Sequence, residues 1–213
     1  MATSISQTRT ALRRAATVEE ILDHAQAILD DQGASAITVS EIARRMGMRA
    51  PSLYKYFDSL NAIQDRLFAR GQTALLAYVE KSVRGLEPGL STLLAGNRAF
   101  IRWSISEIGL ASLLFWRPIP GFEPSAEAYA PALVLATAAR EQLRIAAERG
   151  ELSPAADSDE AYRLLTVVVS GVFSQQAANQ PGADFDDGHF SSLTDEALQM
   201  FVRHYRPTPK EAS

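Results

Sequence analysis

The sequence contains no cysteine among its 213 residues. A chain without thiols has no disulfide framework, no cysteine nucleophile and no cysteine-based zinc site, which favours a reducing compartment. The N-terminal segment lacks an uninterrupted apolar stretch of the secretory kind, and no later apolar run is long and clean enough to span a bilayer. We therefore expect a cytoplasmic globular protein, and its 46% hydrophobic residues are ample for a buried core.

The sequence also lacks the common signatures of catalysis and cofactor binding. The three histidines, His24, His189 and His204, lie far apart, so no spacing of metal ligands is present. Nucleophile-elbow, Walker and dinucleotide-binding glycine patterns are absent. Residues 184–189 place oxygen ligands at alternate positions, but they lack the calcium-loop spacing, and an acidic turn before a helix is the better interpretation. We expect no enzyme activity, no cofactor and no metal; an α-helical enzyme built from distant carboxylates is a rival.

Apolar residues recur at helical spacing along most of the chain, which predicts an all-α fold of about nine helices. A capping box at Thr17 and Glu20 predicts the start of a helix that ends at Gly33. Residues 1–13 are expected to be a mobile arm, whose arginines (with Arg14) could reach a minor groove. Further helices are expected at residues 60–84, 90–116 (apolar all round and therefore buried), 131–149, 157–179 and 190–206.

Residues 38–57 form the most informative stretch, because they predict two short helices joined by a tight turn. Thr38 can cap the first helix while Glu41, three residues on, reaches back to the exposed amides. Gly47 follows the last periodic residue, where a left-handed backbone ends a helix. Pro51 then falls in the first turn of a second helix, where its missing N–H is tolerated. This is the pattern of a helix-turn-helix.

The second helix presents a polar, cationic face. Its outward residues are Arg49, Ala50, Ser52, Lys55 and Tyr56, with Tyr54 at the margin, and such a set suits a phosphate-lined groove. The net charge of the whole chain is −4, but affinity for DNA depends on local phosphate neutralisation. Residues 40–55 hold four basic side chains and a single acidic one. The local charge therefore supports DNA binding.

The motif Thr38-Val39-x-x-Ile42-Ala43-x-x-Met46-Gly47-Met48, followed by Leu53-Tyr54-x-Tyr56-Phe57, resembles the signature of the tetracycline-repressor (TetR) family. The resemblance implies base contact by residues 49–52 and phosphate contact mainly by residues 54–56, with Ser40 as a further contact. Leu60 stands where the family usually has a phosphate-binding lysine, and Arg44, Arg45 or the basic arm could compensate. The predicted DNA-binding set is Thr38, Ser40, Arg44, Arg49, Ala50, Pro51, Ser52, Tyr54, Lys55 and Tyr56.

The same resemblance implies two domains, a DNA-binding head at residues 1–58 and an effector-binding and dimerisation body at residues 59–213. It further implies a homodimer formed by the last two long helices, a palindromic double-stranded DNA operator, and release by a small-molecule effector, as in a repressor. Aromatic residues and a few polar ones could line the effector pocket, although they could equally be ordinary core. The candidates are Phe100, Trp103, Glu107, Phe115, Trp116, Phe122, Tyr129 and Gln175. The rival interpretation is a helical small-molecule or lipid-binding protein with no DNA role.

Overall fold

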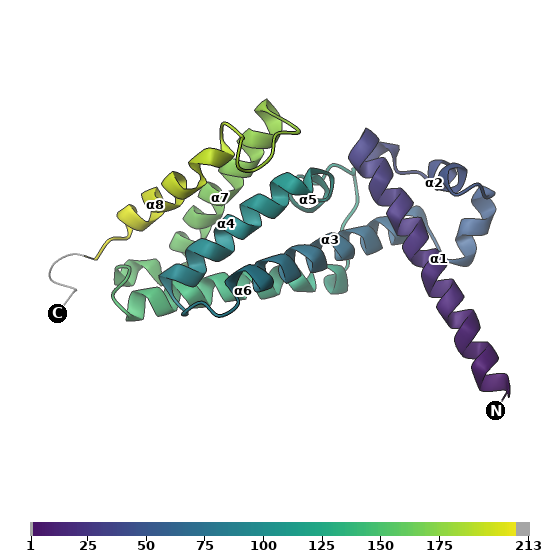
Figure 1. Ribbon diagram of the computed structural model, residues 1–213, viewed down its shortest axis with the longest axis horizontal. Helices are drawn as coiled ribbons and strands as arrows, with labels where there is room; N and C mark the ends of the chain where they lie inside the picture. The colour runs from purple at the N-terminus through teal and green to yellow at the C-terminus, as the bar shows by residue number, and fades with distance from the viewer. Residues whose placement is uncertain (1, 208–213) are drawn as a thin grey trace. The chain divides into compact units, whose positions relative to one another are not determined.

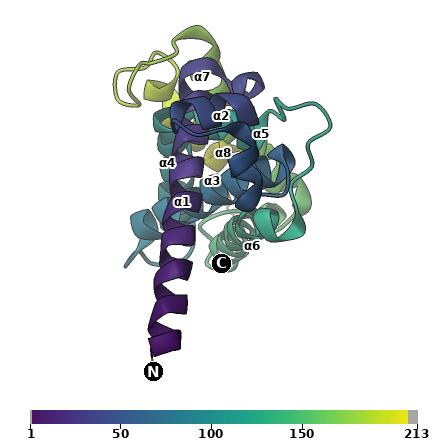
Figure 2. The same ribbon diagram turned by 90° about the vertical axis from the view of Figure 1, so that its right-hand side faces the viewer.

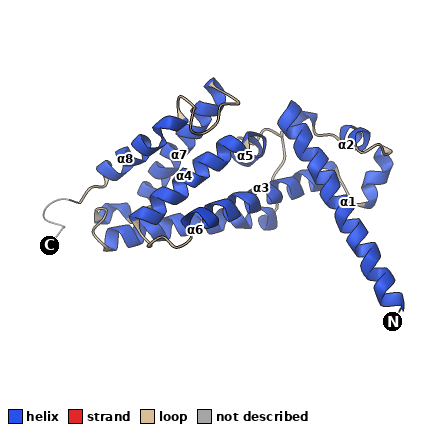
Figure 3. Cartoon of the chain, viewed as in Figure 1, coloured by secondary structure: helices blue, strands red, loops and turns tan. Residues whose placement is uncertain are grey.

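The computed structural model describes residues 2–207, with side chains from residue 9 onward. Within this range the chain forms eight α-helices and four short 3-10 helices and no strand (Figure 1, Figure 3). The predicted all-α fold is therefore confirmed, and counting the six-residue 3-10 helix η2 with the α-helices gives the expected nine. None of the helices in the described range combines the length and apolar character that a membrane span requires.

The elements follow one another with short connections. The α-helices are α1 (Ala2–Gln32), α2 (Val39–Arg45), α3 (Leu60–Val83), α4 (Leu90–Ser106), α5 (Ile108–Phe115), α6 (Ala126–Glu148), α7 (Asp159–Asn179) and α8 (Thr194–His204). The 3-10 helices are η1 (Ala34–Ala36), η2 (Ala50–Lys55), η3 (Pro154–Ala156) and η4 (Ser191–Leu193).

The chain divides into two compact units. The first consists of Met1–Gly71 with Gly109–Tyr129, and the second of Gln72–Ile108 with Ala130–Ser213. Helices α3 and α6 therefore each contribute residues to both units. The functional division predicted at residue 58 falls inside the first unit and stays a prediction.

The first unit is built on the packing of α1, α3 and α5. The apolar face predicted for the first helix is buried, as at Ile21 and Ile28. Gly71 of α3 lets the chain approach α5 closely, because a Cβ there would lie 3.3 Å from a Leu114 methyl group. Arg70 then joins α3 to α1, as its guanidinium donates to Asp23 Oδ1 at 2.6 Å. This packing supports the helix-turn-helix from behind.

The N-terminal segment differs from the prediction. Residues 2–13 belong to α1 and are not an irregular arm. Thr17 lies inside this helix, where its hydroxyl donates to the Arg13 carbonyl at 3.1 Å and so cannot cap a helix start. Thr17 and Glu20 have the spacing of a capping box. A serine or threonine hydroxyl can, however, also donate to the carbonyl of the preceding turn inside a helix, as Thr17 does here.

Three predicted helix limits are also corrected. Residues 90–116 form two helices and not one, because the backbone leaves the helical region at Glu107 (φ −114°, ψ 49°), between the end of α4 at Ser106 and the start of α5 at Ile108. Helix α6 starts at Ala126, five residues before Pro131, since the Ser125 hydroxyl accepts from the Ala128 amide. Helix α7 is capped by Ser158, whose hydroxyl accepts from the Ala161 amide at 3.2 Å.

The second unit packs α7 against α4 and α8. Phe173 of α7 is buried and its ring centroid lies 6.2 Å from that of Phe100 in α4. The buried Gln176 amide holds the segment before η4, as its Oε1 accepts from the backbone amides of Phe190 at 3.0 Å and Ser191 at 3.2 Å. A buried polar side chain is stable here because it is hydrogen-bonded.

Candidate nucleic-acid interface

The start of α2 is fixed by Thr38. Its hydroxyl accepts a hydrogen bond from the Glu41 amide at 3.1 Å, while its own backbone is extended (φ −131°, ψ 153°). One half of the predicted capping box is therefore confirmed. The other half is wrong, because the Glu41 carboxylate is bonded to arginines of its own helix.

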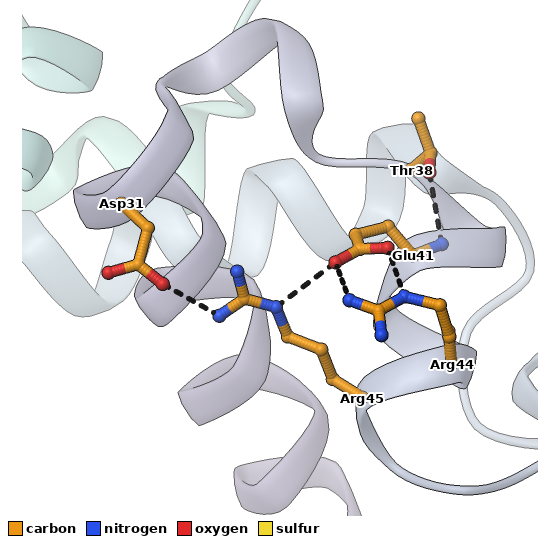
Figure 4. A network of polar contacts seen from close by, with 5 residues as sticks. All are labelled: Asp31, Thr38, Glu41, Arg44 and Arg45. Carbon is orange, nitrogen blue, oxygen red and sulfur yellow. Dashed lines mark hydrogen bonds and ion pairs between the residues drawn. The ribbon is translucent and has the colours of Figure 1, made fainter.

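Glu41 is the centre of a polar network that links α2 to α1 (Figure 4). Its carboxylate accepts from Arg44 Nε and Nη2, both at 2.7 Å, and from Arg45 Nε at 3.2 Å. Arg45 Nη1 in turn donates to Asp31 Oδ2 at 3.0 Å. The hydrogen bonds from the two guanidinium groups lower the pKa of Glu41 from 4.5 to about 2, and the pKa of Arg44 is raised in return.

The turn after α2 closes as the sequence predicts. Gly47 has φ 65°, in the left-handed region that favours glycine. The Met48 amide donates to the Ala43 carbonyl at 3.0 Å and the Gly47 amide to the Arg44 carbonyl at 3.2 Å. These two bonds make a Schellman motif, which satisfies the last carbonyls of α2 and turns the chain toward η2.

The second helix of the motif is a 3-10 helix over most of its length. Pro51 lies in its first turn as predicted, and the Ser52 amide donates to the Arg49 carbonyl at 2.8 Å. Leu53 is its buried anchor, only 1% exposed, and it packs in the core that also holds Ile42 of α2. With its apolar side fixed inward, η2 presents its remaining side chains to the surface.

None of the ten residues predicted to contact DNA is buried in the structure. Four of the second-helix residues, Arg49, Pro51, Tyr54 and Lys55, are exposed, and the other three, Ala50, Ser52 and Tyr56, are half-buried. Thr38, Ser40 and Arg44 of the first helix and its cap are exposed as well. The folded chain thus leaves this face open to a partner.

The cations of this face fall into two groups. No salt bridge within the described range involves Arg49 or Lys55, so their charges face solvent. Arg44 instead forms a salt bridge with Glu41, and Arg45 forms salt bridges with Glu41 and Asp31. The unpaired cations of the motif are therefore Arg49 and Lys55, at the two ends of η2, whereas both arginines of α2 are paired with carboxylates.

Arg14 is a residue at this face whose contact sequence reasoning missed. Its guanidinium, in α1, donates from Nη1 to the Lys55 carbonyl and from Nη2 to the Tyr56 carbonyl at 3.5 Å. Its central carbon also lies 5.5 Å from the centroid of the Tyr56 ring. Because the contact joins residues 41 apart, no local pattern announces it.

Leu60, at the position where the resemblance leads one to expect a lysine, begins α3 in the structure. The Ser59 hydroxyl caps the helix by accepting from the Ala62 amide at 3.1 Å. Asp58, which precedes the cap, is exposed. This corner therefore adds an acidic charge and no cation to the surface.

The predicted effector residues are distributed over both compact units. Phe122 and Tyr129 belong to the first unit, where each ring centroid lies 6.2 Å from that of Phe68. Phe115 and Trp116 lie in the same unit. In the second unit Trp103 is buried and Phe100 and Glu107 are half-buried. Gln175 is exposed there, and its neighbour Gln176 is the buried amide of α7.

The acidic loop before η4 is engaged in an ion pair. Asp186 accepts from both Nη atoms of Arg102, at 2.7 and 2.8 Å, and the Arg102 guanidinium lies 4.1 Å from the Phe185 ring centroid. The bonds from Arg102 lower the pKa of Asp186. The described residues contain no cluster of three or more metal-ligating side chains.

Residues 21–65 match the family model of the bacterial regulatory proteins, tetR family. The HTH-type transcriptional regulator YobS of Bacillus subtilis (strain 168) is 31% identical over 93 residues, which are 44% of this chain and 48% of that protein. The chain thus aligns with about half the length of this curated relative.

Solved structures share the fold over almost the whole chain. The ketosteroid transcriptional regulator KstR2 of Mycobacterium tuberculosis superposes with a TM-score of 0.67 at 19% identity, covering 90% of this chain and 96% of that one. The regulator FadR of Bacillus subtilis, in complex with stearoyl-CoA, gives a TM-score of 0.66 at 16% identity, covering 86% and 97%. At these identities the likeness establishes the fold.

Proposed function

We propose that this chain is a DNA-binding transcriptional regulator of the TetR family, and that it binds a near-palindromic operator as a homodimer, represses from it in the cytoplasm, and is released by a small-molecule effector. The observation that carries the proposal is the exposed face at η2, where no salt bridge among the described residues engages Arg49 or Lys55. The match of residues 21–65 to a family of bacterial regulatory proteins supports a regulator over the rival enzyme.

DNA binding follows from the chemistry of this face. Phosphate contacts fix the position of a protein on duplex DNA, and contacts to base edges specify the sequence. Lys55 and the hydroxyl of Tyr54 stand at the C-terminal end of η2 and suit the phosphates. Arg49, which precedes the helix, is the side chain best suited to a guanine edge, because its planar guanidinium can donate two parallel hydrogen bonds.

Selection of genomic DNA fragments by the purified protein tests the proposal. We expect enrichment of a near-palindromic motif whose half-site centres lie about 34 to 36 Å, or a multiple of this distance, apart. Recovery of no enriched sequence would contradict DNA regulation and favour a helical ligand-binding protein. Replacement of Arg49 should change the enriched motif, because this side chain is proposed to read a base.

The homodimer is supported by an unpartnered apolar stripe on the second unit. Val167 of α7 is 65% exposed and Met200 of α8 is 60% exposed, although α7 and α8 pack together on their other faces. Gly171 lies four residues after Val167 and the exposed Leu193 seven residues before Met200, so each pair shares a helix face, and we call these four residues the stripe. Nothing lies within 4 Å of the Cβ position of Gly171. A second copy placed on this stripe would bury these apolar side chains and could approach closely at the glycine.

Light scattering after gel filtration tests the dimer directly. The wild type should have twice the chain mass of 23.2 kDa. Met200→Glu with Val167→Glu should give the monomer mass with an unchanged helical circular-dichroism signal, since both side chains are exposed. Leu133→Glu is the matched control, because Leu133 is 58% exposed on α6 and lies outside the stripe. A double variant that stays dimeric would refute the assignment of this face.

Effector control is supported by aromatic side chains that pack on α3, in the same compact unit as the helix-turn-helix. Phe68 of α3 contacts Phe122 and Tyr129 within the first unit. Gly109 lies against the end of α1, since a Cβ there would collide with the Asp30 carboxylate. A ligand that displaced the segment from 109 to 129 would therefore move groups in contact with α1 and α3. Other proteins of this fold have been solved with stearoyl-CoA or with choline bound.

The coupling is tested by a reciprocal binding experiment. A compound found by thermal-shift screening should weaken operator affinity, and operator DNA should weaken the affinity for that compound by the same factor. Phe122→Ala, in the first unit, should reduce this factor. Phe100→Ala, in the second unit, tests whether Phe100 contacts the ligand. A compound that binds the body tightly but leaves operator affinity unchanged would contradict the release mechanism.

A further inference from the structure

Residues 9–16 of α1 form a basic and exposed stretch of helix. Residues 1–18 contain Arg9, Arg13 and Arg14 and no acidic side chain; the first acid is Glu19. Every residue from 9 to 16 is exposed, including Leu12 at 66%. In both views this half of α1 extends past α2 and η2 (Figure 1, Figure 2). Residues 9–16 therefore contribute charge and almost no core to the first unit.

Arg14 fixes this helix to the end of the recognition element. The last carbonyls of η2 have no partner within their own helix, and they carry the negative end of its dipole. Arg14 donates to the carbonyls of Lys55 and Tyr56 and lies over the Tyr56 ring. Since Lys55 and Tyr56 are the residues expected to touch phosphates, α1 leaves the motif at the edge of the DNA-binding surface.

The geometry of α1 gives the extension a defined reach. From Arg14 to Ala2 the helix rises about 18 Å, which is the length of about five base pairs of duplex. Arg9 and Arg13 are four residues apart, so they project from the same face of the helix. No salt bridge within the described range holds either of them.

Few cations of the helix-turn-helix itself are free to bind phosphate. Arg44 and Arg45 are paired with Glu41 and Asp31, and Leu60 offers no charge at the start of α3. Lys55 and Arg49 are then the remaining unpaired cations of the motif. A regulator gains affinity from each phosphate that it neutralises, and the extension carries further positive charge beside the motif.

We propose that the first turns of α1 form a second DNA-contacting element, in which Arg9 and Arg13 bind the phosphate backbone flanking each half-site. Arg14 is the positioning residue that ties this element to η2. The inference rests on the proposed function, because it needs an operator. It goes beyond the helix-turn-helix, since it predicts that base pairs outside the half-sites contribute to affinity without contributing to sequence preference.

Operator affinity measured over a series of salt concentrations tests the proposal with the full-length double variant Arg9→Gln, Arg13→Gln. Each lost phosphate contact should reduce the slope of log affinity against log salt by about 0.9, so the variant should lose about 1.8 per subunit. Lys81→Gln with Arg84→Gln is the control, because it removes the same charge from exposed positions outside the unit that holds the motif. The control slope should equal that of the wild type.

Two lengths of duplex sharpen the test. The wild type should bind a duplex that ends at the half-site edges more weakly than one with extra flanking base pairs, whereas the double variant should bind both equally. Arg14→Gln should lower the ratio of specific to non-specific affinity, because it releases η2. The Arg9 and Arg13 changes should lower both affinities alike, and Arg14→Lys should restore only part of the loss.

The possible failures are distinguishable. A wild type that binds the selected operator, with a double variant whose slope matches the control, would overturn the extension and leave the regulator in place. Equal wild-type affinity for the short and long duplexes would overturn it too. A wild type that binds no duplex in the genomic selection would overturn the proposed function, and the present inference with it.

Discussion

The helix-turn-helix and the proposed effector-binding body build their surfaces in different ways. The DNA-binding groups proposed for the helix-turn-helix itself lie between residues 38 and 56, and the turn at Gly47 and the anchor at Leu53 are enough to turn them outward. The proposed effector groups come from residues 100 to 175 and from both compact units. Binding by the first region therefore depends on a short local motif, whereas binding by the second depends on how distant helices pack.

The largest effects should come from the buried anchors of the two regions. Leu53→Ala and Phe173→Ala each empty a site that is 1% exposed, and such truncations cost about 2–5 kcal/mol and about 3–5 kcal/mol in the free energy of unfolding. Leu53→Ala should abolish operator binding and leave the dimer intact. Phe173→Ala should weaken the dimer. Denaturation curves with light scattering check both, and equal loss of dimer in the two variants would break the distinction.

Two glycines sharpen the comparison at a smaller scale. Gly47→Ala places a side chain at φ 65°, which should cost about 1–2 kcal/mol and weaken operator binding. Gly171→Ala lies within α7 with open space around its Cβ, so the isolated chain should gain about 1 kcal/mol from helix propensity.

The association of the Gly171→Ala chains should nevertheless weaken, because the added methyl group would stand in the proposed dimer stripe. Dilution series monitored by light scattering separate the two effects. A Gly171→Ala protein that dimerises as tightly as the wild type would place the interface elsewhere, and a Gly47→Ala protein of unchanged stability would contradict the role of the turn.

Within the helix-turn-helix, replacing an unpaired cation should lower the salt dependence of DNA binding more than replacing a cation that is paired with a carboxylate. Lys55→Gln should reduce the salt slope of operator binding by about 0.9, because its charge is available to a phosphate. Arg44→Gln should reduce it less, since two hydrogen bonds at 2.7 Å commit that guanidinium to Glu41. Anisotropy titrations at several salt concentrations measure both slopes, and a larger effect of Arg44→Gln would show that DNA displaces Glu41.

The smallest expected effect is a change in the free energy of unfolding at acidic pH. Glu41 has its pKa lowered from 4.5 to about 2, so its contribution to stability is fully present above pH 4.5 and is lost as the pH falls through about 2. The difference in stability between wild type and Glu41→Gln should therefore be constant above pH 4.5 and shrink below it. Thermal unfolding across this range measures the difference, and a change near neutral pH would exclude Glu41 as its source.

The sequence predicted the features of the fold that have local causes. The Thr38 cap, the left-handed Gly47 and the first-turn Pro51 are confirmed, because each depends on the backbone within a few residues. The break at Glu107 escaped prediction, because apolar residues continue on both sides of it and the nearest glycine, Gly109, already lies inside α5. The contact of Arg14 with the end of η2 escaped it as well, because only the tertiary packing of α1 brings these residues together.

The central claim is that side chains of η2 read DNA, and the most direct measurement compares the genomic motifs enriched by the wild type and by Arg49→Ala. The account predicts a near-palindromic motif for the wild type and a loss of preference at one symmetric pair of positions for the variant, with the rest of the motif retained. Identical motifs from both proteins, or no enrichment by the wild type, would contradict it.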